Sequence, residues 1–280
     1  MMWKDSYRLG IESIDQQHME LFRMTEALAE TCKEVLEFLK DYVIYHFKDE
    51  EAYQASIHYS GIEAHKAEHR QFTQTVLEYE KCLKENGFDR KTMKDLAGTV
   101  TVWLIYHVVD TDQKIVAGEE YTSRETSFHK NIDVFANSAL EIMETMAGLD
   151  RSKVQQQTTS LYHSKRDISI TIELVGDLKG KVVFGFSKEL ALYLIQTMTM
   201  MELRTLDELV RSALCELTNI TCGNATVALA KHGLHCDIRP PVASQGGDYN
   251  IDGTGVRIDT AFGCLEVGVQ IENPEKQAIS

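Results

Sequence analysis

The sequence predicts two domains, an all-α up-and-down four-helix bundle followed by an α+β domain. The first part of the chain has few helix breakers, because the three prolines all lie after residue 239 and residues 11–116 contain only three glycines. After about residue 135, alternating apolar and polar runs appear between helical stretches, which is typical of an α+β domain. At 280 residues, the chain is long enough for both domains.

Four long helices are expected before residue 118. Asp15 is suited to cap the first of them. No glycine or proline separates the first helix from the second, so their boundary is placed near residues 31–34. The chain then breaks at 59–61, a third helix runs from about 63 to 85, and a fourth runs from Asp89 to about 116. Four helices with such short connections imply an up-and-down bundle.

The second part is expected to alternate strands with helices. The predicted strands cover about 168–174, 182–186 and 264–271, and the predicted helices cover about 136–147, 188–200 and 206–231. The polar segment between the two parts is interpreted as a linker. The predicted domains are therefore 1–118 and 136–280, joined by a linker region at 119–135.

Composition and charge exclude several classes of protein. The net charge of −14 argues against nucleic-acid binding, because too few basic groups are available to neutralise phosphates. No apolar run reaches about 18 residues, so no membrane span is expected. The N-terminus lacks an apolar signal segment, and the six cysteines form no CxxC pair and are expected to be free thiols. The sequence therefore favours a cytoplasmic protein.

Seven potential metal ligands fall within the first 112 residues: His18, His46, Glu50, His65, His69, His107 and Asp112. The pairs His46/Glu50 and His65/His69 are each four residues apart, which places both members of a pair on one face of a helix. Five histidines with two carboxylates are the set that a two-metal site inside a bundle would need. Nitrogen and oxygen donors without a thiolate suit iron, manganese or zinc.

The pair His107 and Asp112 does not follow this spacing. These residues are five apart, which is about 140° around an α-helix. That angle is awkward for one metal and more natural for a carboxylate that bridges two metals. Asp110, three residues after His107, is the geometric alternative.

These ligands lie in four motifs: Ile14-Asp15-Gln16-Gln17-His18, His46-Phe47-Lys48-Asp49-Glu50-Glu51, His65-x3-His69 and Trp103-Leu104-x2-His107-x4-Asp112. Over about residues 1–118, the chain thereby resembles the bacterial hemerythrin family. The resemblance implies a non-haem di-iron centre in a four-helix bundle, in which Glu50 and Asp112 bridge two irons together with an oxo or hydroxo group. Three histidines would hold one iron and two the other. The resemblance also selects Asp112 over Asp110.

A count of bonds leaves one coordination position free. Five histidines, two bridging carboxylates and an oxo or hydroxo bridge supply about eleven of the roughly twelve positions that two octahedral irons need. The resemblance implies that O2 binds reversibly at the free position. The matching apolar pocket would consist of Leu21, Phe47, Trp103, Leu104 and Val108, although a plain bundle core explains these residues equally well.

In the second part, Glu216 and Asn219 are three residues apart on one predicted helix and share a face. By spacing alone, a solvated helix face is the favoured explanation of the pair. The segments that carry a resemblance are Glu216-x2-Asn219-x3-Gly223-Asn224-Ala225, Asn137-Ser138-Ala139-Leu140 and Met146-Ala147-Gly148. With the order of strands and helices, they resemble the chemotaxis phosphatase CheX, of the CheC/CheX/FliY group.

The CheX resemblance implies an aspartyl-phosphate phosphatase that acts on a phosphorylated CheY-type response regulator. Asn219 would position the attacking water, and Glu216 would hold a lysine of the regulator. The regulator would supply Mg²⁺ together with the phosphoryl group, so the chain would act by orientation. The resemblance also implies a homodimer formed through this domain.

The two resemblances together predict an oxygen-responsive signalling protein, in which the di-iron bundle senses O2, nitric oxide or redox state and controls the phosphatase. One alternative is an O2 storage or delivery protein that is docked by a non-catalytic CheX-like domain. The other is a di-iron redox enzyme acting on O2, peroxide or nitric oxide.

Overall fold

The computed structural model describes residues 3–28, 33–87, 89–117, 131–159, 162–251 and 254–272. Within these residues the chain forms two compact units, which are described one at a time. No helix in the described part of the chain is long and apolar enough to cross a membrane. None of the described cysteines is joined in a disulfide bond, and these are Cys82, Cys215, Cys222, Cys236 and Cys264.

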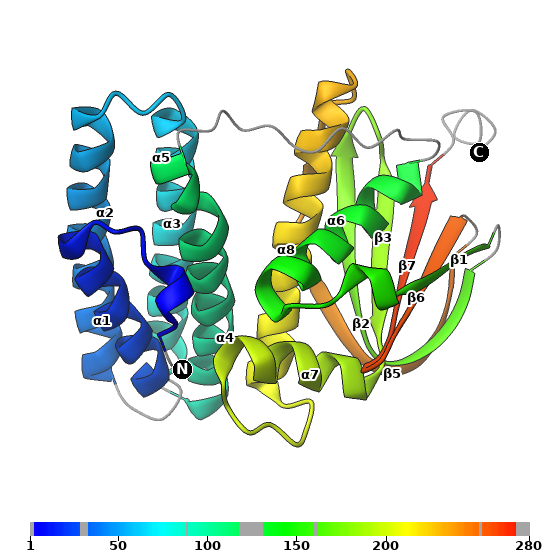
Figure 1. Cartoon of the computed structure of the whole chain (residues 1–280). Coiled ribbons are helices and arrows are strands. Elements are labelled where there is room, and N and C mark those ends of the chain that lie inside the picture. Colours follow the sequence, from blue (N-terminus) through cyan, green and yellow to red (C-terminus); the bar gives the residue numbers. More distant parts are fainter. Residues whose placement is uncertain are drawn as a thin grey trace. The chain divides into compact units, whose positions relative to one another are not determined.

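The first unit is a helical bundle, as the sequence predicts (Figure 1). Its elements are η1 (Asp5–Tyr7), α1 (Glu12–Leu28), α2 (Lys33–Ser56), α3 (Ile62–Asn86), α4 (Arg90–Tyr106), η2 (His107–Thr111) and α5 (Gln113–Ala117). Each of the four long helices packs against the next along the chain, and α4 closes the ring against α1. The expected fourth helix is thus present, but it is interrupted by η2 near its end.

The bounds of the long helices follow local signals. Helix α3 ends before Gly87, whose φ of 90° favours glycine. Helix α4 begins after Asp89, whose side chain accepts a hydrogen bond from the N–H of Thr92 at 2.9 Å. The expected boundary between the first two helices, near 31–34, lies partly outside the described residues, and α2 is helical from Lys33.

Asp15 does not cap α1, because the helix begins three residues earlier at Glu12. Its buried carboxylate instead accepts hydrogen bonds from the N–H groups of Leu9 at 2.8 Å and Gly10 at 3.1 Å. Asp15 therefore anchors the segment that precedes α1. Its hydrogen bonds reach back five and six residues, whereas a capping side chain binds N–H groups two or three residues ahead of it.

The second unit is an antiparallel sheet with helices (Figure 1). Its helices are α6 (Asn131–Ala147), η3 (Arg151–Lys153), most of α7 (Lys188–Thr199) and most of α8 (Glu208–Lys231). Its strands are β1 (Gln155–Thr159), β2 (Tyr162–Gly176), β3 (Gly180–Phe186), β4 (Cys236–Ile238), β5 (Val242–Ile251), β6 (Thr254–Thr260) and β7 (Gly263–Ile271). The strand order is β1-β6-β7-β3-β2-β4, and β5 also pairs with β2.

The core of this unit lies between the sheet and two of its helices. Ala139 of α6 and Leu217 of α8 meet Phe184 of β3 and Leu265 of β7 around a cavity of about 10 Å³. Phe184 and Leu265 lie on the same face of the sheet, because Phe184 pairs with Val267 and side chains alternate along a strand. Helices α6 and α8 therefore cover one face.

The α+β class is correct, but strands β1, β4, β5 and β6 were not predicted. Helix α6 begins at Asn131, five residues before the expected start at 136, so residues 131–135 of the expected linker are helical. The rest of the expected linker, residues 119–130, lies outside the described part of the chain. The proposed domain boundaries stay a prediction.

Asp15→Ala is expected to lower the free energy of unfolding of the metal-free protein by about 1–3 kcal/mol, because the N–H groups of Leu9 and Gly10 lose the buried carboxylate that accepts from them. Urea unfolding followed by circular dichroism measures this change. Glu12→Ala is the matched control, since Glu12 is an exposed acid in the same turn of α1 and its loss should change stability by less than about 0.5 kcal/mol. Equal effects of the two variants would contradict the role of Asp15.

Candidate functional site

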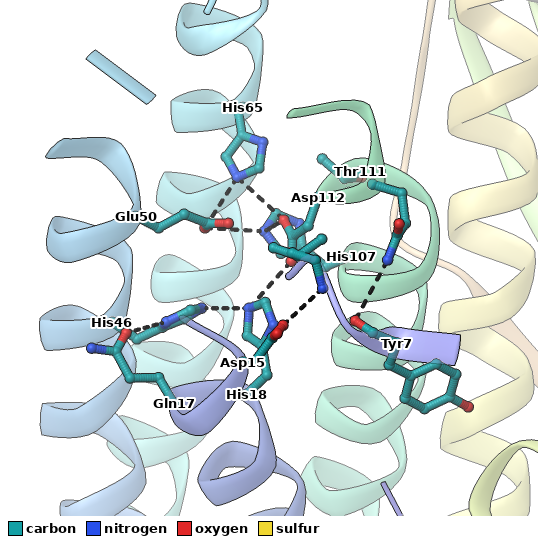
Figure 2. A network of polar contacts seen from close by, with 12 residues as sticks. Tyr7, Asp15, Gln17, His18, His46, Glu50, His65, His107, Thr111 and Asp112 are labelled. Carbon is teal, nitrogen blue, oxygen red and sulfur yellow. Dashed lines mark hydrogen bonds and ion pairs between the residues drawn. The ribbon is translucent and has the colours of Figure 1, made fainter. Parts of the chain in front are cut away.

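Seven buried side chains meet inside the helical bundle: His18, His46, Glu50, His65, His69, His107 and Asp112. They come from α1, α2, α3 and the interrupted fourth helix. Each has an exposed fraction of 3% or less. Figure 2 shows the labelled members of this set pointing toward one another, although they lie far apart in the sequence. All seven metal-ligand candidates are therefore brought to one place.

One group of donors contains three histidines and Glu50. The Nε2 atoms of His69 and His107 are 3.0 Å apart. Oε2 of Glu50 lies 3.2 Å from Nε2 of His69 and 3.3 Å from Nε2 of His65. Neighbouring donors around an octahedral metal with bonds of ~2.1 Å are about 3 Å apart, so these separations suit one shared cation.

A second group forms around His18, Glu50 and Asp112. Nε2 of His18 lies 3.1 Å from Nε2 of His46 and 3.3 Å from Oδ2 of Asp112. The other oxygen of Asp112 lies 3.1 Å from Nε2 of His107, a member of the first group. Both carboxylates thus lie between the two groups, which is the arrangement that two bridged cations require.

The position of Asp112 depends on a single π-helical turn, η2. The N–H of Asp112 donates to the carbonyl of His107 at 2.8 Å, a hydrogen bond that spans five residues instead of four. This wider turn brings residues five apart onto one face and removes the angular mismatch of a regular helix. Asp110 lies on another face, where it forms an ion pair with Lys114.

Outer hydrogen bonds orient the ring of His46. Its Nδ1 atom lies 2.8 Å from Oε1 of Gln17, and Nε2 of Gln17 donates to Asp49 at 2.9 Å. Because the carboxylate of Asp49 accepts, the amide oxygen of Gln17 faces the imidazole, and His46 carries its proton on Nδ1. The lone pair of Nε2 then points into the centre, as a metal ligand requires.

Two other ligands have outer carboxylates. Nδ1 of His69 donates to Glu51 at 2.9 Å, and Nδ1 of His107 lies 3.4 Å from Glu68. Glu68 also accepts from the hydroxyl of Thr111 at 3.1 Å. Sequence reasoning did not find these partners, because each contact joins two different helices and leaves no spacing signal on one.

Aromatic rings hold two of the ligands in place. The ring of Phe47 stacks on His69 with centroids 3.7 Å apart, and the ring of Trp103 stacks on His107 with centroids 4.4 Å apart. Trp103 also stacks on Phe72 at 3.8 Å. Stacking of this kind restricts rotation of the imidazoles and so contributes to their orientation.

A cavity of about 10 Å³ lies beside the ligands, which is about the least space that holds one water molecule. Of the five residues expected to form an apolar pocket, Leu21, Phe47, Trp103 and Leu104 line this cavity, and Val108 does not. Val108 is fully buried in η2, next to His107. The other lining residues are Thr25, Leu39, Val43, Phe72 and Val100.

The electrostatics of the cluster fit a cation. Burial lowers the pKa of His46 to about 4, which keeps this ligand neutral. Burial also lowers the pKa of His107, but the carboxylates of Asp112 and Glu50 outweigh burial and raise it to about 10. Burial and the negative charge of Glu50 together raise the pKa of Asp112 well above its usual range. The metal-free centre therefore retains protons where cations would bind.

Unpaired oxygens provide a direct test of fit. Oε1 of Glu50 and both carboxylate oxygens of Asp112 are buried without a hydrogen-bond partner among the described residues. Buried carboxylate oxygens without donors are costly, and a bound cation would satisfy them. The residues present therefore fit a metal ion.

The second candidate pair lies on α8. Glu216 and Asn219 are half-buried, and Leu217, Thr218 and Thr221 of the same helix line the cavity against the sheet. The pair therefore projects from a side of the helix other than the one that faces the sheet. An amide beside a carboxylate can orient a water and bind a cation, but it provides no nucleophile of its own.

Comparison with known proteins decides the family. Residues 9–117 match the model of the Hemerythrin HHE cation binding domain, and residues 168–259 match that of the Chemotaxis phosphatase CheX. A bacteriohemerythrin of Clostridium acetobutylicum is 30% identical over 128 residues, which cover 41% of this chain and 98% of that protein. The CheY-P phosphatase CheX of Thermotoga maritima is 31% identical over 126 residues, which cover 45% and 81%. The chain belongs to both families.

The crystal structure of the chemotaxis protein CheX from Vibrio vulnificus is also similar to this chain, with 24% identity and a TM-score of 0.47, covering 51% of this chain and 99% of that one. The hemerythrin match contains all seven buried ligand candidates, and the CheX match contains Glu216 and Asn219. The hemerythrin part therefore carries a buried His/Glu/Asp cluster that fits a cation site, and the CheX part is homologous to a CheY-P phosphatase.

Asp112→Ala is expected to lower the metal affinity of the hemerythrin part by at least about 10-fold, because it removes an oxygen donor that lies between both ligand groups. Metal bound per chain, measured by elemental analysis after anaerobic loading with Fe²⁺, reports this loss. Asp110→Ala removes a carboxylate two residues away that pairs with Lys114, and it should keep the metal content of the wild type. Equal metal content in the two variants would show that Asp112 is not a ligand.

Metal binding is expected to release protons and to tighten as the pH rises from 6 to 9. The pKa of His107, raised to about 10, means that this imidazole is protonated in the metal-free protein near neutral pH, and the raised pKa of Asp112 favours a proton there as well. A bound cation must displace such protons. Raising the pH removes the competing protons, so affinity increases. Titration calorimetry in two buffers of different ionisation enthalpy should give a release of about one proton or more per chain. A buffer-independent enthalpy would contradict this account.

Proposed function

We propose that this chain is an oxygen-responsive signalling protein, in which a di-iron hemerythrin part controls the phosphatase activity of a CheX part. The observation that carries the proposal is that one chain holds both a buried two-carboxylate, five-histidine cluster and a CheX domain. A protein that only carries oxygen has no use for a domain homologous to a CheY-P phosphatase. The proposal includes a cytoplasmic location and a homodimer formed through the CheX part.

In this proposal the seven ligands hold two iron ions. The nitrogen and oxygen donor set suits iron, and hemerythrin membership favours it over manganese or zinc. Glu50 and Asp112 would bridge the ions, with His65, His69 and His107 on one side and His18 and His46 on the other. Iron in this site supplies reversible binding of a small gas and a change of oxidation state.

The chain's own residues would favour a small apolar ligand. The cavity beside the ligands is lined mainly by aliphatic and aromatic side chains, including Leu21 and Trp103. A pocket of this kind excludes water and charged molecules, whereas O2 or nitric oxide can enter it without losing hydrogen bonds. This supports a gas sensor over an enzyme that takes a polar substrate.

The CheX part would act on the phospho-aspartate of a CheY-type response regulator. Asn219 would orient a water toward the phosphorus atom, and Glu216 would bind a lysine of the regulator and so align the two proteins. The regulator would supply Mg²⁺ and the phosphoryl group. Catalysis would then come from positioning, which agrees with the absence of a nucleophile in the Glu216–Asn219 pair.

The decisive measurement is the rate at which the full chain dephosphorylates a phosphorylated CheY-type regulator in three states: ferrous without O2, ferrous with O2, and oxidised. A sensor should give rates that differ between states by about 5-fold or more, which corresponds to a typical coupling free energy. Equal rates in the three states would refute sensing. A stable oxygenated spectrum with no phosphatase activity would favour oxygen storage, and rapid oxidation with turnover would favour a redox enzyme.

Asn219→Ala should lower the dephosphorylation rate by at least about 100-fold, because the attacking water would lose its orientation. Gln196→Ala is the matched control, since it removes a half-buried amide from α7 and should retain the wild-type rate. The iron content and optical spectrum of both variants should match the wild type. Equal loss of activity in both variants would indicate a structural effect and count against Asn219.

A further inference from the structure

Gln54 is a buried amide without a hydrogen-bond partner next to the metal ligands. It lies on α2, four residues after Glu50, and none of its surface is exposed. Neither its oxygen nor its nitrogen has a hydrogen-bond partner among the described residues. A carboxamide offers one acceptor and two donor hydrogens, and burying them unpaired is unfavourable. The position therefore requires a polar partner.

Gln54 lies on the side of the ligands opposite the apolar cavity. Along the inward face of α2, Val43 and Phe47 line the cavity, Glu50 follows as a ligand, and Gln54 follows one turn later. The amide therefore cannot be explained as part of the gas pocket. Its partner must lie at the other end of the cluster, where α2 leads into α3.

His65 is the ligand at that end. Two backbone hydrogen bonds fix the turn between the helices: the N–H of Tyr59 donates to the carbonyl of Gln54, and the N–H of His65 donates to the carbonyl of Gly61, each at 3.0 Å. Nε2 of His65 lies 3.3 Å from Glu50, one helical turn before Gln54. The Nδ1 atom of His65 is buried and has no hydrogen-bond partner among the described residues.

His65 differs from His46 and His69, whose outer nitrogens have hydrogen-bond partners, and from His107, whose unpaired Nδ1 still lies 3.4 Å from a carboxylate oxygen of Glu68. The outer nitrogens of His46, His69 and His107 face Gln17, Glu51 and Glu68 respectively. His18 also has an unpaired Nδ1, but it contacts His46, which lies eight residues before Gln54 on α2, or about 12 Å along the helix. Among the ligands with an unpaired outer nitrogen, His107 already faces a carboxylate and His18 lies away from Gln54, whereas His65 contacts Glu50, one helical turn before Gln54.

We propose that Gln54 is a positioning residue of the metal centre, whose amide oxygen accepts a hydrogen bond from Nδ1–H of His65 through one bound water. One helical turn is about 5.4 Å, and a water with two hydrogen bonds of ~2.8 Å spans a comparable distance. The contact fixes the tautomer with the Nε2 lone pair directed at the metal and makes His65 a stronger donor. The inference rests on the proposed metal centre and adds a residue to it.

The test compares the full-length Gln54→Met variant with the wild type after anaerobic loading with Fe²⁺ and, separately, with Co²⁺. Loss of the acceptor should weaken Co²⁺ binding by about 10- to 100-fold and shift the midpoint potential of the iron centre upward, because a weaker histidine donor stabilises the oxidised form less. Gln17→Met, which removes the observed partner of His46, should shift both quantities in the same direction. Gln74→Met, an exposed change on α3, should shift neither.

Gln54→Glu separates positioning from packing. It restores an acceptor for His65 and adds negative charge, so the potential should fall below that of Gln54→Met. The metal-free Gln54→Met protein should remain folded with a stability close to that of the wild type, since methionine fills a similar buried volume. Unchanged potential and Co²⁺ affinity in Gln54→Met, with a clear shift in Gln17→Met, would overturn the inference.

Loading with Fe²⁺ and Co²⁺ separately distinguishes failure of the Gln54 inference from failure of the proposed function. A wild-type chain that takes up Co²⁺ but no iron would refute the di-iron function, while the Co²⁺ affinities would still decide the role of Gln54. A chain that takes up neither metal would overturn both.

Discussion

The burial of two carboxylates at one point constrains the rest of the helical bundle, because their negative charge must be balanced there. Glu50 and Asp112 are fully buried and lie among the same imidazoles. Their mutual repulsion and loss of hydration raise the pKa of Asp112, and only positive charge can compensate both. In the metal-free protein, protons supply this positive charge. Metal ions would compensate the two carboxylates better, because each carboxylate has two oxygens that can be shared between ions. The five histidines, the outer acids and the stacked aromatic rings then fix where that charge sits.

The π-helical turn shows how the backbone meets this requirement. A regular α-helix would leave His107 and Asp112 about 140° apart, and Asp110 would be the better placed acid. One extra residue in the turn moves Asp112 onto the ligand face and leaves Asp110 to pair with Lys114 at the surface. Spacing rules assume regular helices, so the sequence alone left both aspartates open. The family resemblance separated them, and the structure supplies the physical reason.

Other features of the fold also divide into those that local sequence signals determine and those that depend on tertiary contacts. Breaks such as Gly61 and Gly87 act locally, so the bounds of α3 could be predicted to within a residue. Strand β1 could not, because Gln155–Thr159 is polar and is held to β6 through backbone pairing, with no apolar face to detect. The contacts of Asp15 and of Gln17 were missed for a related reason. Each joins segments whose approach depends on tertiary structure, and a periodicity argument covers one element at a time.

The two parts of the chain use contrasting chemistry, and thermodynamics constrains how they can communicate. In the proposed function, the buried hemerythrin ligands would need only a metal and a small molecule, whereas the partly accessible Glu216 and Asn219 would need a partner protein to complete their site. If the state of the metal centre alters affinity for a phosphorylated regulator, the regulator must alter affinity for the gas by the same factor. A sensor of this kind therefore has an oxygen affinity that depends on its signalling partner. That reciprocity distinguishes a coupled protein from two independent domains on one chain.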